Sequence, residues 1–378
     1  MALFEILQQA LVSVVVAYLG FTNTVGDRIQ AFFSDTSETT EISEETSIPL
    51  YPEADIKTPA RTAADVLRRD ANFQRAALIA ANQGDHEYTA PDTLETEELL
   101  RESLVNIYCQ YKTDTHIRTT TGTGFFINAK GVILTNAHVA QFLLLEDSGY
   151  APGTVECIIR SGDPATPRYE AELLYISPNW IFENASLISD EHPRGTGERD
   201  YALLYVSASL NKEPLPVRFP ALPFDVALLP RNTEGKTVIT GGYPAGALLR
   251  GGADAALAPV VAGSTIGSLY TFGSNYADLF AVAESPVGEE GASGGPIVES
   301  GTGKTIGLIV TRGDEALEGP RSLRALTLSY LDRSMQEETG FSLAQNMQGD
   351  VALRGRVFKQ AILPFLAEIL GGELTTER

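Results

Sequence analysis

A long series of short strand-like runs between residues 103 and 329 constrains this chain more than any other feature. Each run is apolar or alternates apolar with polar residues, and turn segments such as Asn128-Ala129-Lys130-Gly131 separate neighbouring runs. The runs are 103–111, 124–128, 132–135, 155–159, 169–176 and 201–206, followed by 237–240, 260–271, 279–283, 296–299, 306–311 and 323–329. Because no helices separate these strands, the pattern favours an all-β barrel architecture over parallel βαβ units.

A glycine-rich serine loop, Gly291-Ala292-Ser293-Gly294-Gly295-Pro296, lies between two of the runs. Three glycines around one serine let the backbone turn tightly, expose the hydroxyl and direct peptide N–H groups inward. This arrangement is typical of a nucleophile beside an oxyanion-binding site.

A serine needs a general base, and the base needs a group that orients it. Candidates for both lie upstream at the ends of strand-like runs. His138 follows the run 132–135, and Asp200 opens the run 201–206. Either residue alone is weak evidence, since His86, His116 and His192 occur in this chain without any motif.

Four segments together carry a family resemblance. In order they are Gly122-Thr-Gly-Phe-Phe-Ile-Asn128, Leu134-Thr-Asn-Ala-His138, Asp200-Tyr-Ala-Leu-Leu204 and Gly291-Ala-Ser-Gly-Gly-Pro296. This set resembles the trypsin-like serine proteases of the chymotrypsin fold, in the manner of bacterial Deg-type members, and the order His, Asp, Ser is that of the family. The resemblance covers residues 103–333. It implies two antiparallel six-stranded β-barrels, with His138 and Asp200 on the first, Ser293 on the second and the site in the cleft between them.

In this reading, Ser293 attacks a peptide carbonyl while His138 takes the hydroxyl proton and later gives it to the leaving amine. Asp200 holds the other ring nitrogen of His138, and the backbone N–H groups of Gly291 and Ser293 bind the oxyanion. This chemistry requires no cofactor and no metal ion.

Substrate contacts are also predicted by resemblance. Val287 occupies the position, six residues before the nucleophile, where tryptic members carry an acid that binds Arg or Lys. An apolar pocket floor follows, which favours aliphatic or small apolar side chains before the cleaved bond. Thr311-Arg312-Gly313 matches the edge strand that pairs with the backbone of a polypeptide substrate.

The N-terminal region predicts a membrane attachment. No charged residue occurs from residue 6 to residue 26, and residues 10–21 are strongly apolar. This length lies between that of a bilayer-spanning helix and that of a signal-peptide core. Because no Lys or Arg precedes the core and no clear cleavage site follows it, we predict an uncleaved anchor within residues 1–33, with the catalytic domain outside the cytoplasm. A secreted protein with a removed signal peptide and a soluble buried helix are the alternatives.

Short extensions flank the catalytic domain. Residues 34–60 are acidic and poor in apolar residues, which predicts a flexible linker. Residues 61–102 show helical spacing at 62–82 and at 92–101, and residues 334–378 show it at 351–370, with a kink expected at Pro364. We expect these helices to pack on the catalytic domain rather than to form a regulatory module or, at the C-terminus, a membrane- or partner-binding surface. We expect no PDZ-like peptide-binding module within residues 334–378, because this segment is too short for one.

Charge and cysteine content limit the remaining alternatives. The formal net charge is −21, from 49 acidic and 28 basic residues, and this balance argues strongly against nucleic acid as a partner because phosphate binding draws on clustered Lys and Arg. Cys109 and Cys157 lie in strand-like runs at a spacing that suggests neither a metal site nor a disulfide framework, so two buried thiols are expected rather than a bridge. The sequence therefore predicts a membrane-anchored serine endopeptidase, and the alternative is a catalytically silent protease-like scaffold that binds peptides or partners.

Overall fold

The computed structural model describes residues 93–375, apart from 115–116, 147, 191–194, 247–255, 274 and 314–320. All described residues belong to one compact unit, Ala90–Arg378. The predicted anchor, the acidic linker and the helix at 62–82 lie outside the described residues. Within 93–375, none of the helices combines the length and the apolar character that crossing a bilayer requires.

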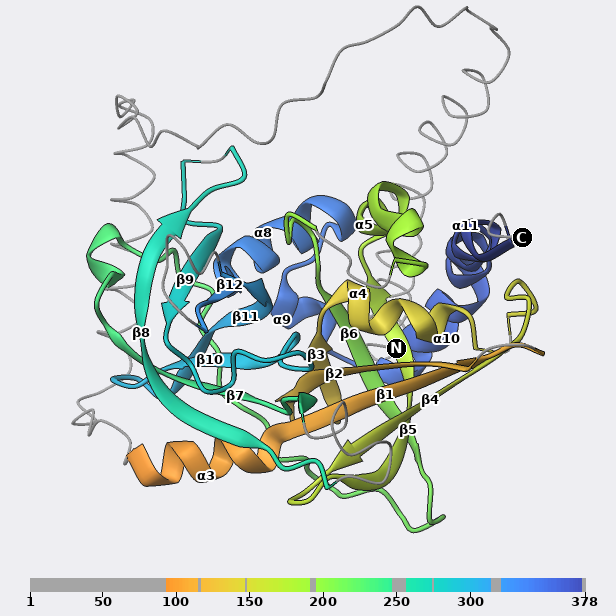
Figure 1. Ribbon diagram of the computed structural model, residues 1–378, viewed down its shortest axis with the longest axis horizontal. Helices are drawn as coiled ribbons and strands as arrows, with labels where there is room; N and C mark the ends of the chain where they lie inside the picture. Colours follow the sequence, from red (N-terminus) through yellow and green to blue (C-terminus); the bar gives the residue numbers. More distant parts are fainter. Residues whose placement is uncertain are drawn as a thin grey trace, which may run out of the picture. The chain divides into compact units, whose positions relative to one another are not determined.

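The first half of the described chain forms a closed antiparallel barrel (Figure 1). Its strands are β1 (Leu104–Lys112), β2 (Ile117–Asn128), β3 (Val132–Thr135), β4 (Thr154–Ser161), β5 (Thr166–Ile176) and β6 (Ala202–Ser209). They pair in the order β1-β2-β3-β6-β5-β4, and β1 closes the barrel by pairing with both β2 and β4.

The second half forms another closed antiparallel barrel of six strands. These are β7 (Thr237–Gly242), β8 (Val260–Tyr270), β9 (Leu279–Ala283), β10 (Pro296–Glu299), β11 (Lys304–Arg312) and β12 (Leu323–Thr327), paired in the order β10-β11-β12-β9-β8-β7. The predicted fold class is therefore confirmed. The last strand was predicted to run to residue 329, which is wrong, because Thr327 caps a helix that begins at Leu328.

Alternation along the strands divides the apolar side chains between the barrel interiors and the contact between the barrels. On β2, Phe126 lies in the cluster that fills the first barrel, while its neighbour Phe125 lies in the cluster between the barrels. Successive strand residues point to opposite faces, so one strand supplies both cores. Both barrels therefore contribute buried apolar side chains to the contact between them.

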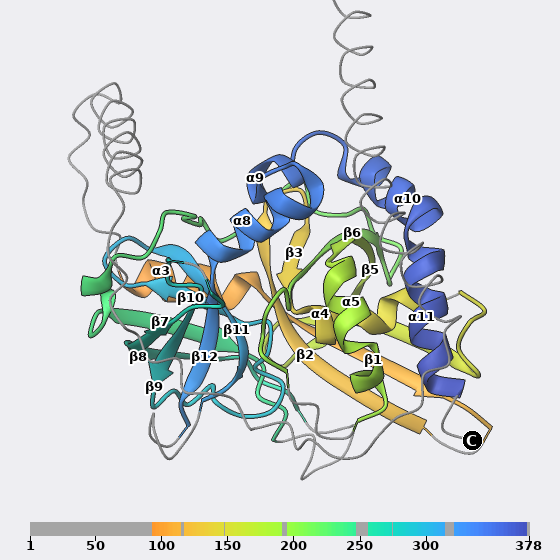
Figure 2. The ribbon, with the colours of Figure 1, turned by 90° about the horizontal axis from the view of Figure 1, so that it is seen from above.

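Helices cover the outside of the barrels. They are α3 (Thr93–Ser103), α4 (Ala137–Ala140), η1 (Gln141–Leu144), α5 (Pro178–Asn184), η2 (Ala185–Ile188), η3 (Arg231–Thr233), α8 (Leu328–Thr339), α9 (Leu343–Asn346), α10 (Val351–Ala361) and α11 (Leu363–Thr375). Figure 2 shows α10 and α11 along one side of the first barrel. The predicted C-terminal helix is broken between α10 and α11, next to Pro364, and Phe358, Leu366 and Leu370 join the core of the first barrel. Packing on the catalytic domain is thus confirmed for this extension.

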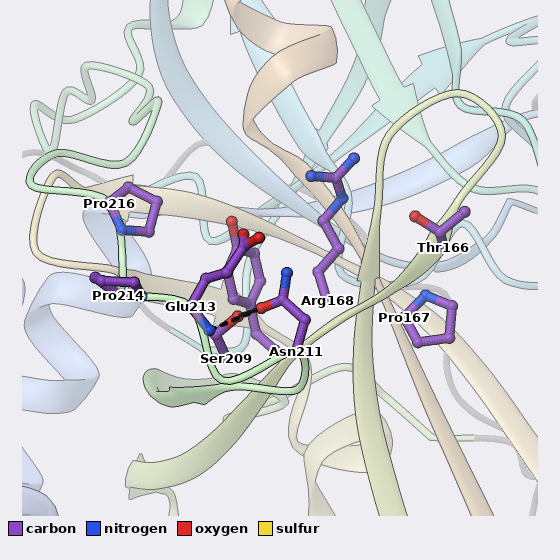
Figure 3. Close-up of a pocket in the computed structure, with 9 residues that line it drawn as sticks. Thr166, Pro167, Arg168, Ser209, Asn211, Glu213, Pro214 and Pro216 are labelled. Atoms are coloured by element: carbon purple, nitrogen blue, oxygen red, sulfur yellow. Dashed lines mark hydrogen bonds between the residues drawn. The ribbon is translucent and has the colours of Figure 1, made fainter.

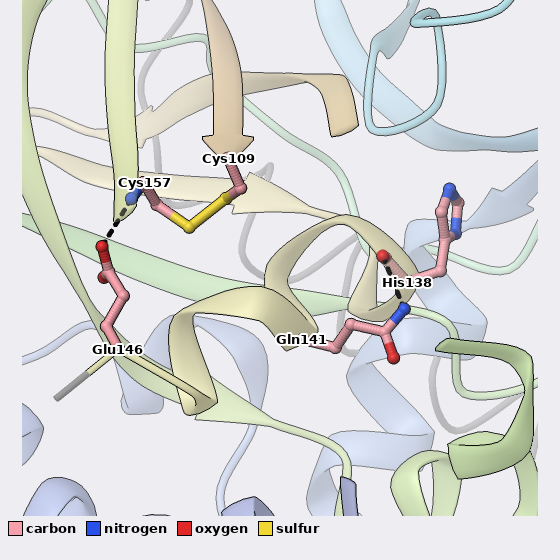
Figure 4. The surroundings of a disulfide bond; sticks show 5 residues. All are labelled: Cys109, His138, Gln141, Glu146 and Cys157. Atoms are coloured by element: carbon pink, nitrogen blue, oxygen red, sulfur yellow. Dashed lines mark hydrogen bonds between the residues drawn. A yellow bond between two sulfur atoms is a disulfide. The ribbon is translucent and has the colours of Figure 1, made fainter. Parts of the chain in front are cut away.

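The expectation of two free thiols is wrong. Cys109 on β1 and Cys157 on β4 form a disulfide, with their Cα atoms 4.0 Å apart (Figure 4). The two residues stand directly opposite each other in the register of the β1/β4 pair. The bridge therefore links neighbouring strands of the first barrel across 48 residues of chain.

Candidate active site

Two neighbouring strands of the first barrel position His138 and Asp200. Thr135 at the end of β3 pairs with Ala202 at the start of β6. His138 follows Thr135 by three residues and Asp200 precedes Ala202 by two, so both leave the sheet at the same end. Antiparallel pairing thus brings together two residues that are 62 positions apart in the sequence.

The carboxylate of Asp200 holds both the ring and the backbone of His138. Nδ1 of His138 lies 2.7 Å from Oδ2 of Asp200, and the backbone N–H of His138 donates to Oδ1 at 3.0 Å. Asp200 is buried, whereas 29% of the His138 side-chain surface is exposed. This contact occupies Nδ1 and orients the imidazole, so that Nε2 is the ring nitrogen available for proton transfer.

Two amide side chains hold the backbone around this pair. Nδ2 of Asn136 donates to the carbonyl of Asp200 at 2.8 Å. Nε2 of Gln141 donates to the carbonyl of His138 at 2.9 Å, as Figure 4 shows. Both residues are buried and neither was predicted from the sequence. Asn136 lies within the Leu134–His138 motif, so its position was the only available signal.

The pKa of His138 results from opposing effects. Burial by itself lowers it, but the charge of Asp200 and the hydrogen bond to Asp200 together raise the pKa above its ordinary value. A protonated His138 is therefore stabilised in this site. That is the property needed in a base that carries a proton between two steps.

A buried glutamate from the C-terminal extension braces the Asp200 segment. Glu338 on α8 accepts hydrogen bonds from Oγ of Ser177 at 2.9 Å and from Nδ2 of Asn179 at 2.8 Å, and also from the hydroxyl of Tyr175. Nε of Arg199, the residue before Asp200, lies 3.6 Å from the same carboxylate. Sequence reasoning missed Glu338 because its partners are more than 130 residues away.

The serine loop has the backbone conformation that its glycines allow. Gly291 has φ of +90°, and a Cβ there would lie 2.6 Å from the carbonyl oxygen of Tyr243, so only glycine fits. Among the described residues, neither the N–H of Gly291 nor that of Ser293 donates to a backbone carbonyl. The carbonyl on the other side of each peptide is occupied: Glu290 accepts from the N–H of Ala245 at 2.5 Å, and Ala292 accepts from that of Gly295 at 2.9 Å.

These bonds fix where the two N–H groups point. A trans peptide is planar, with its C=O and N–H directed to opposite sides. Because the carbonyls of Glu290 and Ala292 face the protein, the N–H groups of Gly291 and Ser293 face away from those contacts. Two backbone donors from peptides separated by one other peptide can converge on one anionic oxygen in this way.

Ser293 is tied to the first barrel through β2. Its carbonyl accepts a hydrogen bond from the N–H of Thr123 at 2.8 Å, and the carbonyl of Thr123 accepts one from Oγ1 of Thr135 at 2.7 Å. Thr135 is three residues before His138. The serine loop therefore contacts the first barrel beside the segment that carries the histidine.

The predicted substrate residues divide into two groups. Val287 has no exposed surface and packs in the core of the second barrel, so the structure does not place it on the wall of an open pocket. Thr311 and Arg312 close β11, where they pair with β12, and Gly313 donates to the carbonyl of Ser322 at 2.7 Å. Among the described residues no strand pairs with their other edge, because β10 reaches only as far as Leu308. Arg312 also lies 3.8 Å from Glu290, and both side chains are more than half exposed.

A separate shallow hollow of about 300 Å³ lies on the first barrel (Figure 3). It is formed by the start of β5 and the segment after β6, with Arg168, Glu213 and several prolines around it. None of the predicted site residues lines it. Within the described part of the chain, no cluster of His, Cys, Asp and Glu has the composition of a metal site.

Comparison with known proteins supports a protease assignment. Residues 122–308 match the family model of the trypsin-like peptidase domain. No curated protein sequence matches the chain. Among solved structures, the chain is similar to the active form of the Rv3671c protease from M. tuberculosis, with 19% sequence identity and a TM-score of 0.39 over 67% of this chain and 89% of that one.

Because that TM-score is low, the assignment rests on the matched segment and on the topology of the two closed barrels. The matched segment runs from the Gly122 motif through His138, Asp200 and the serine loop. The chain therefore contains a trypsin-like peptidase domain over residues 122–308, which supports its assignment as a serine endopeptidase.

Proposed function

We propose that this protein hydrolyses peptide bonds through a catalytic triad of Ser293, His138 and Asp200. The observation that carries the proposal is the double contact of the Asp200 carboxylate with the ring and the backbone of His138. A carboxylate that only ended a loop would not need to hold both. The tie between Ser293 and Thr123, beside the segment of His138, supports the third member.

In the proposed mechanism, Oγ of Ser293 attacks the substrate carbonyl while Nε2 of His138 takes its proton. Asp200 stabilises the imidazolium that forms, and His138 passes the proton to the leaving amine. Water then repeats the sequence on the acyl-enzyme and releases the acid. The N–H groups of Gly291 and Ser293 stabilise the oxyanion in both halves, and one such donor contributes about 3 kcal/mol.

The polypeptide substrate is proposed to bind as an added strand along Thr311, Arg312 and Gly313. Their edge without a strand partner supports this, since an extended peptide gains backbone hydrogen bonds there. Exposed Arg312 and Glu290 lie at the same place and can contact substrate side chains.

For the side chain before the cleaved bond we propose a preference for small or apolar groups. The support is that the position of Val287 carries an apolar, fully buried side chain, so no acid stands there to bind Arg or Lys. Cleavage of a randomised peptide library measures this preference. A profile dominated by Arg or Lys would contradict it and leave the triad untouched.

We also propose that residues 1–33 anchor the protein in a membrane with the peptidase domain outside the cytoplasm. The uncharged run from 6 to 26 supports the anchor, and the Cys109–Cys157 disulfide suits an oxidising compartment. Extraction of the full-length protein from membranes only by detergent is the expected result. Recovery of a shortened, freely soluble protein would favour signal cleavage instead.

Labelling with a fluorophosphonate probe tests the triad. We expect the wild type to be labelled and Ser293→Ala and His138→Ala to be silent, with all three equally folded. A wild type that is folded but neither labelled nor able to cleave a peptide library would favour the alternative, a protease-like scaffold that binds peptides. Labelling of Ser293→Ala would place the nucleophile elsewhere.

A further inference from the structure

We propose that Thr123 is a positioning residue that holds the serine loop in the conformation able to bind an oxyanion. This inference rests on the proposed function, since it assigns a role in the same reaction. Thr123 lies on β2 of the first barrel and is fully buried. Among the described residues, its hydrogen bonds reach neither the imidazole of His138 nor the hydroxyl of Ser293, and it acts through the backbone of Gly291 and Ser293.

Every polar atom of Thr123 contacts the site. Its hydroxyl donates to the carbonyl of Gly291 at 2.6 Å and accepts from the N–H of Tyr243 at 2.9 Å. Its N–H donates to Ser293 and its carbonyl accepts from Thr135. Because the Tyr243 N–H occupies the hydroxyl oxygen as a donor, the hydroxyl proton is left to the Gly291 carbonyl, and the direction of this bond is fixed.

The hydroxyl and one backbone bond together clamp the two peptides beside Gly291. The carbonyl of Gly291 is held by Thr123, and the carbonyl of Glu290 is held by the N–H of Ala245, two residues after Tyr243. The serine loop is thus held against the segment that follows β7, directly by the N–H of Ala245 and through the Thr123 hydroxyl by the N–H of Tyr243. The Glu290 carbonyl fixes the peptide that carries the Gly291 N–H, and the Gly291 carbonyl fixes the next peptide, which connects this donor to the peptide of the Ser293 N–H.

Loss of the hydroxyl releases this clamp. The carbonyl of Gly291 would then lack its donor in a partly buried position, which favours a rotation of the peptide that finds a new partner. Glycine opposes such rotation less than any other residue. The Gly291–Ala292 peptide joins the two peptides that carry the N–H groups of Gly291 and Ser293. Its rotation would therefore move these two donors relative to each other and weaken oxyanion binding, while the substrate edge at Thr311 to Gly313 stayed intact.

The test compares Thr123→Val, which keeps the shape and loses the hydroxyl, with Thr123→Ser, which keeps the hydroxyl. We expect Thr123→Val to lower kcat about 100-fold, with KM changed less than about threefold, because one oxyanion donor is worth 10²- to 10³-fold in kcat. Binding of a peptide aldehyde, which forms a tetrahedral adduct, should weaken by a similar factor. Thr123→Ser should retain kcat within about threefold.

Thr327→Val is the matched control. Thr327 is also fully buried, and its hydroxyl likewise donates to a backbone carbonyl, of Ala277 at 3.0 Å, and accepts from a backbone N–H, of Tyr330 at 3.0 Å. This variant should lose stability and keep kcat. If Thr327→Val lowers kcat as much as Thr123→Val does, the effect is general destabilisation and the proposal fails.

The remaining outcomes separate this inference from the proposed function. Wild-type kcat in Thr123→Val, or an equal loss in Thr123→Ser and Thr123→Val, would overturn the role of the hydroxyl while leaving the triad in place. If Thr123→Val does not fold, Thr123→Ser decides: a 100-fold loss there overturns the proposal, and retention of kcat and of aldehyde binding supports it. A folded wild type without activity overturns the proposed function itself.

Discussion

The two carboxylate oxygens of Asp200 contact two different parts of His138, the ring nitrogen Nδ1 at 2.7 Å and the backbone N–H at 3.0 Å. Rotation of the carboxylate would break one bond or the other. The aspartate therefore fixes the position of α4 as well as the orientation of the imidazole. We therefore expect substitutions at Asp200 to change the tautomer and the pKa of His138 more than they change the stability of the fold.

Asp200→Asn should lower kcat by about 10³- to 10⁴-fold. The amide can keep the bond from the backbone N–H of His138, but its NH₂ group then faces Nδ1 and holds the wrong tautomer. Steady-state kinetics measure the loss, and thermal unfolding should show an intact domain. A loss of less than tenfold in a folded variant would contradict the assigned role.

The pH dependence should follow the raised pKa of His138. Catalysis needs the neutral base, so the acidic limb of kcat/KM should lie above the ordinary histidine pKa, and in Asp200→Asn it should move to lower pH. The stability of the fold should change with pH in the opposite direction from activity, because the folded state favours protonated His138. The stabilisation from the Asp200–His138 pair is complete below the pKa of an unfolded histidine and is lost as pH rises through the folded pKa. NMR titration of His138 in Ser293→Ala measures the pKa directly. A value at or below the ordinary one would contradict this prediction.

Glu338→Gln should change the pH dependence of stability. Burial raises the pKa of Glu338 against the lowering effect of its hydrogen bonds. The folded protein therefore binds this proton more tightly than the unfolded chain does, and stability falls as pH rises from the ordinary glutamate pKa through the raised folded value. The advantage of wild type over Glu338→Gln in the free energy of unfolding should shrink across that window in urea titrations. An advantage that grows with pH would show that the carboxylate is held ionised.

Two glycines in the C-terminal helices should respond oppositely to alanine. A Cβ on Gly355 of α10 would overlap the ring of Tyr205, whereas a Cβ on Gly372 of α11 would enter open space. Gly372→Ala should therefore gain up to about 1 kcal/mol from helix propensity. Gly355→Ala should lose about 1–3 kcal/mol through overpacking. Thermal unfolding of both variants measures the difference, and stabilisation by Gly355→Ala would mean that α10 does not pack on β6 as described.

The disulfide should stabilise the first barrel. Removing it by replacing Cys109 and Cys157 with serine should cost about 4 kcal/mol, the loop-closure value for a bridge with a sequence separation of 48. Reductant should destabilise the wild type by a similar amount and leave the double variant unchanged. Equal stability of wild type with and without reductant would contradict the bridge.

The strands were predictable because each carries its own local signal. The runs at 132–135, 279–283 and 296–299 coincide with β3, β9 and β10, since turn residues bound them on both sides. The disulfide was not predictable in this way. It depends on the register of β1 against β4, and spacing along the chain does not contain that register.

Some helices were missed although the signal was present. Ser177 caps α5 by accepting from the N–H of Trp180, and Pro178 follows it at the first helical position. Leu328, Leu331 and Met335 repeat at helical spacing on α8 and are all fully buried. In both places the prediction followed the strand pattern of the surrounding sequence and not the local signal for the start of a helix.

The site divides along the same line. His138, Asp200 and the serine loop were identified because each stands in a sequence context typical of its role. No sequence context pointed to the roles of Thr123, Gln141 and Glu338, which follow only from their contacts in the folded chain.

Closure of the barrels sets a lower limit on the part of this chain that a shortened protein must contain. The segment matching the trypsin-like family begins at residue 122 and ends at 308, so it omits β1 and β12. A protein cut at these residues would expose β4 of the first barrel and β9 of the second as unpaired edge strands. Such strands can pair with strands of other molecules and cause aggregation. Any excised version intended for crystallisation or screening must therefore retain the chain from Leu104 to Thr327.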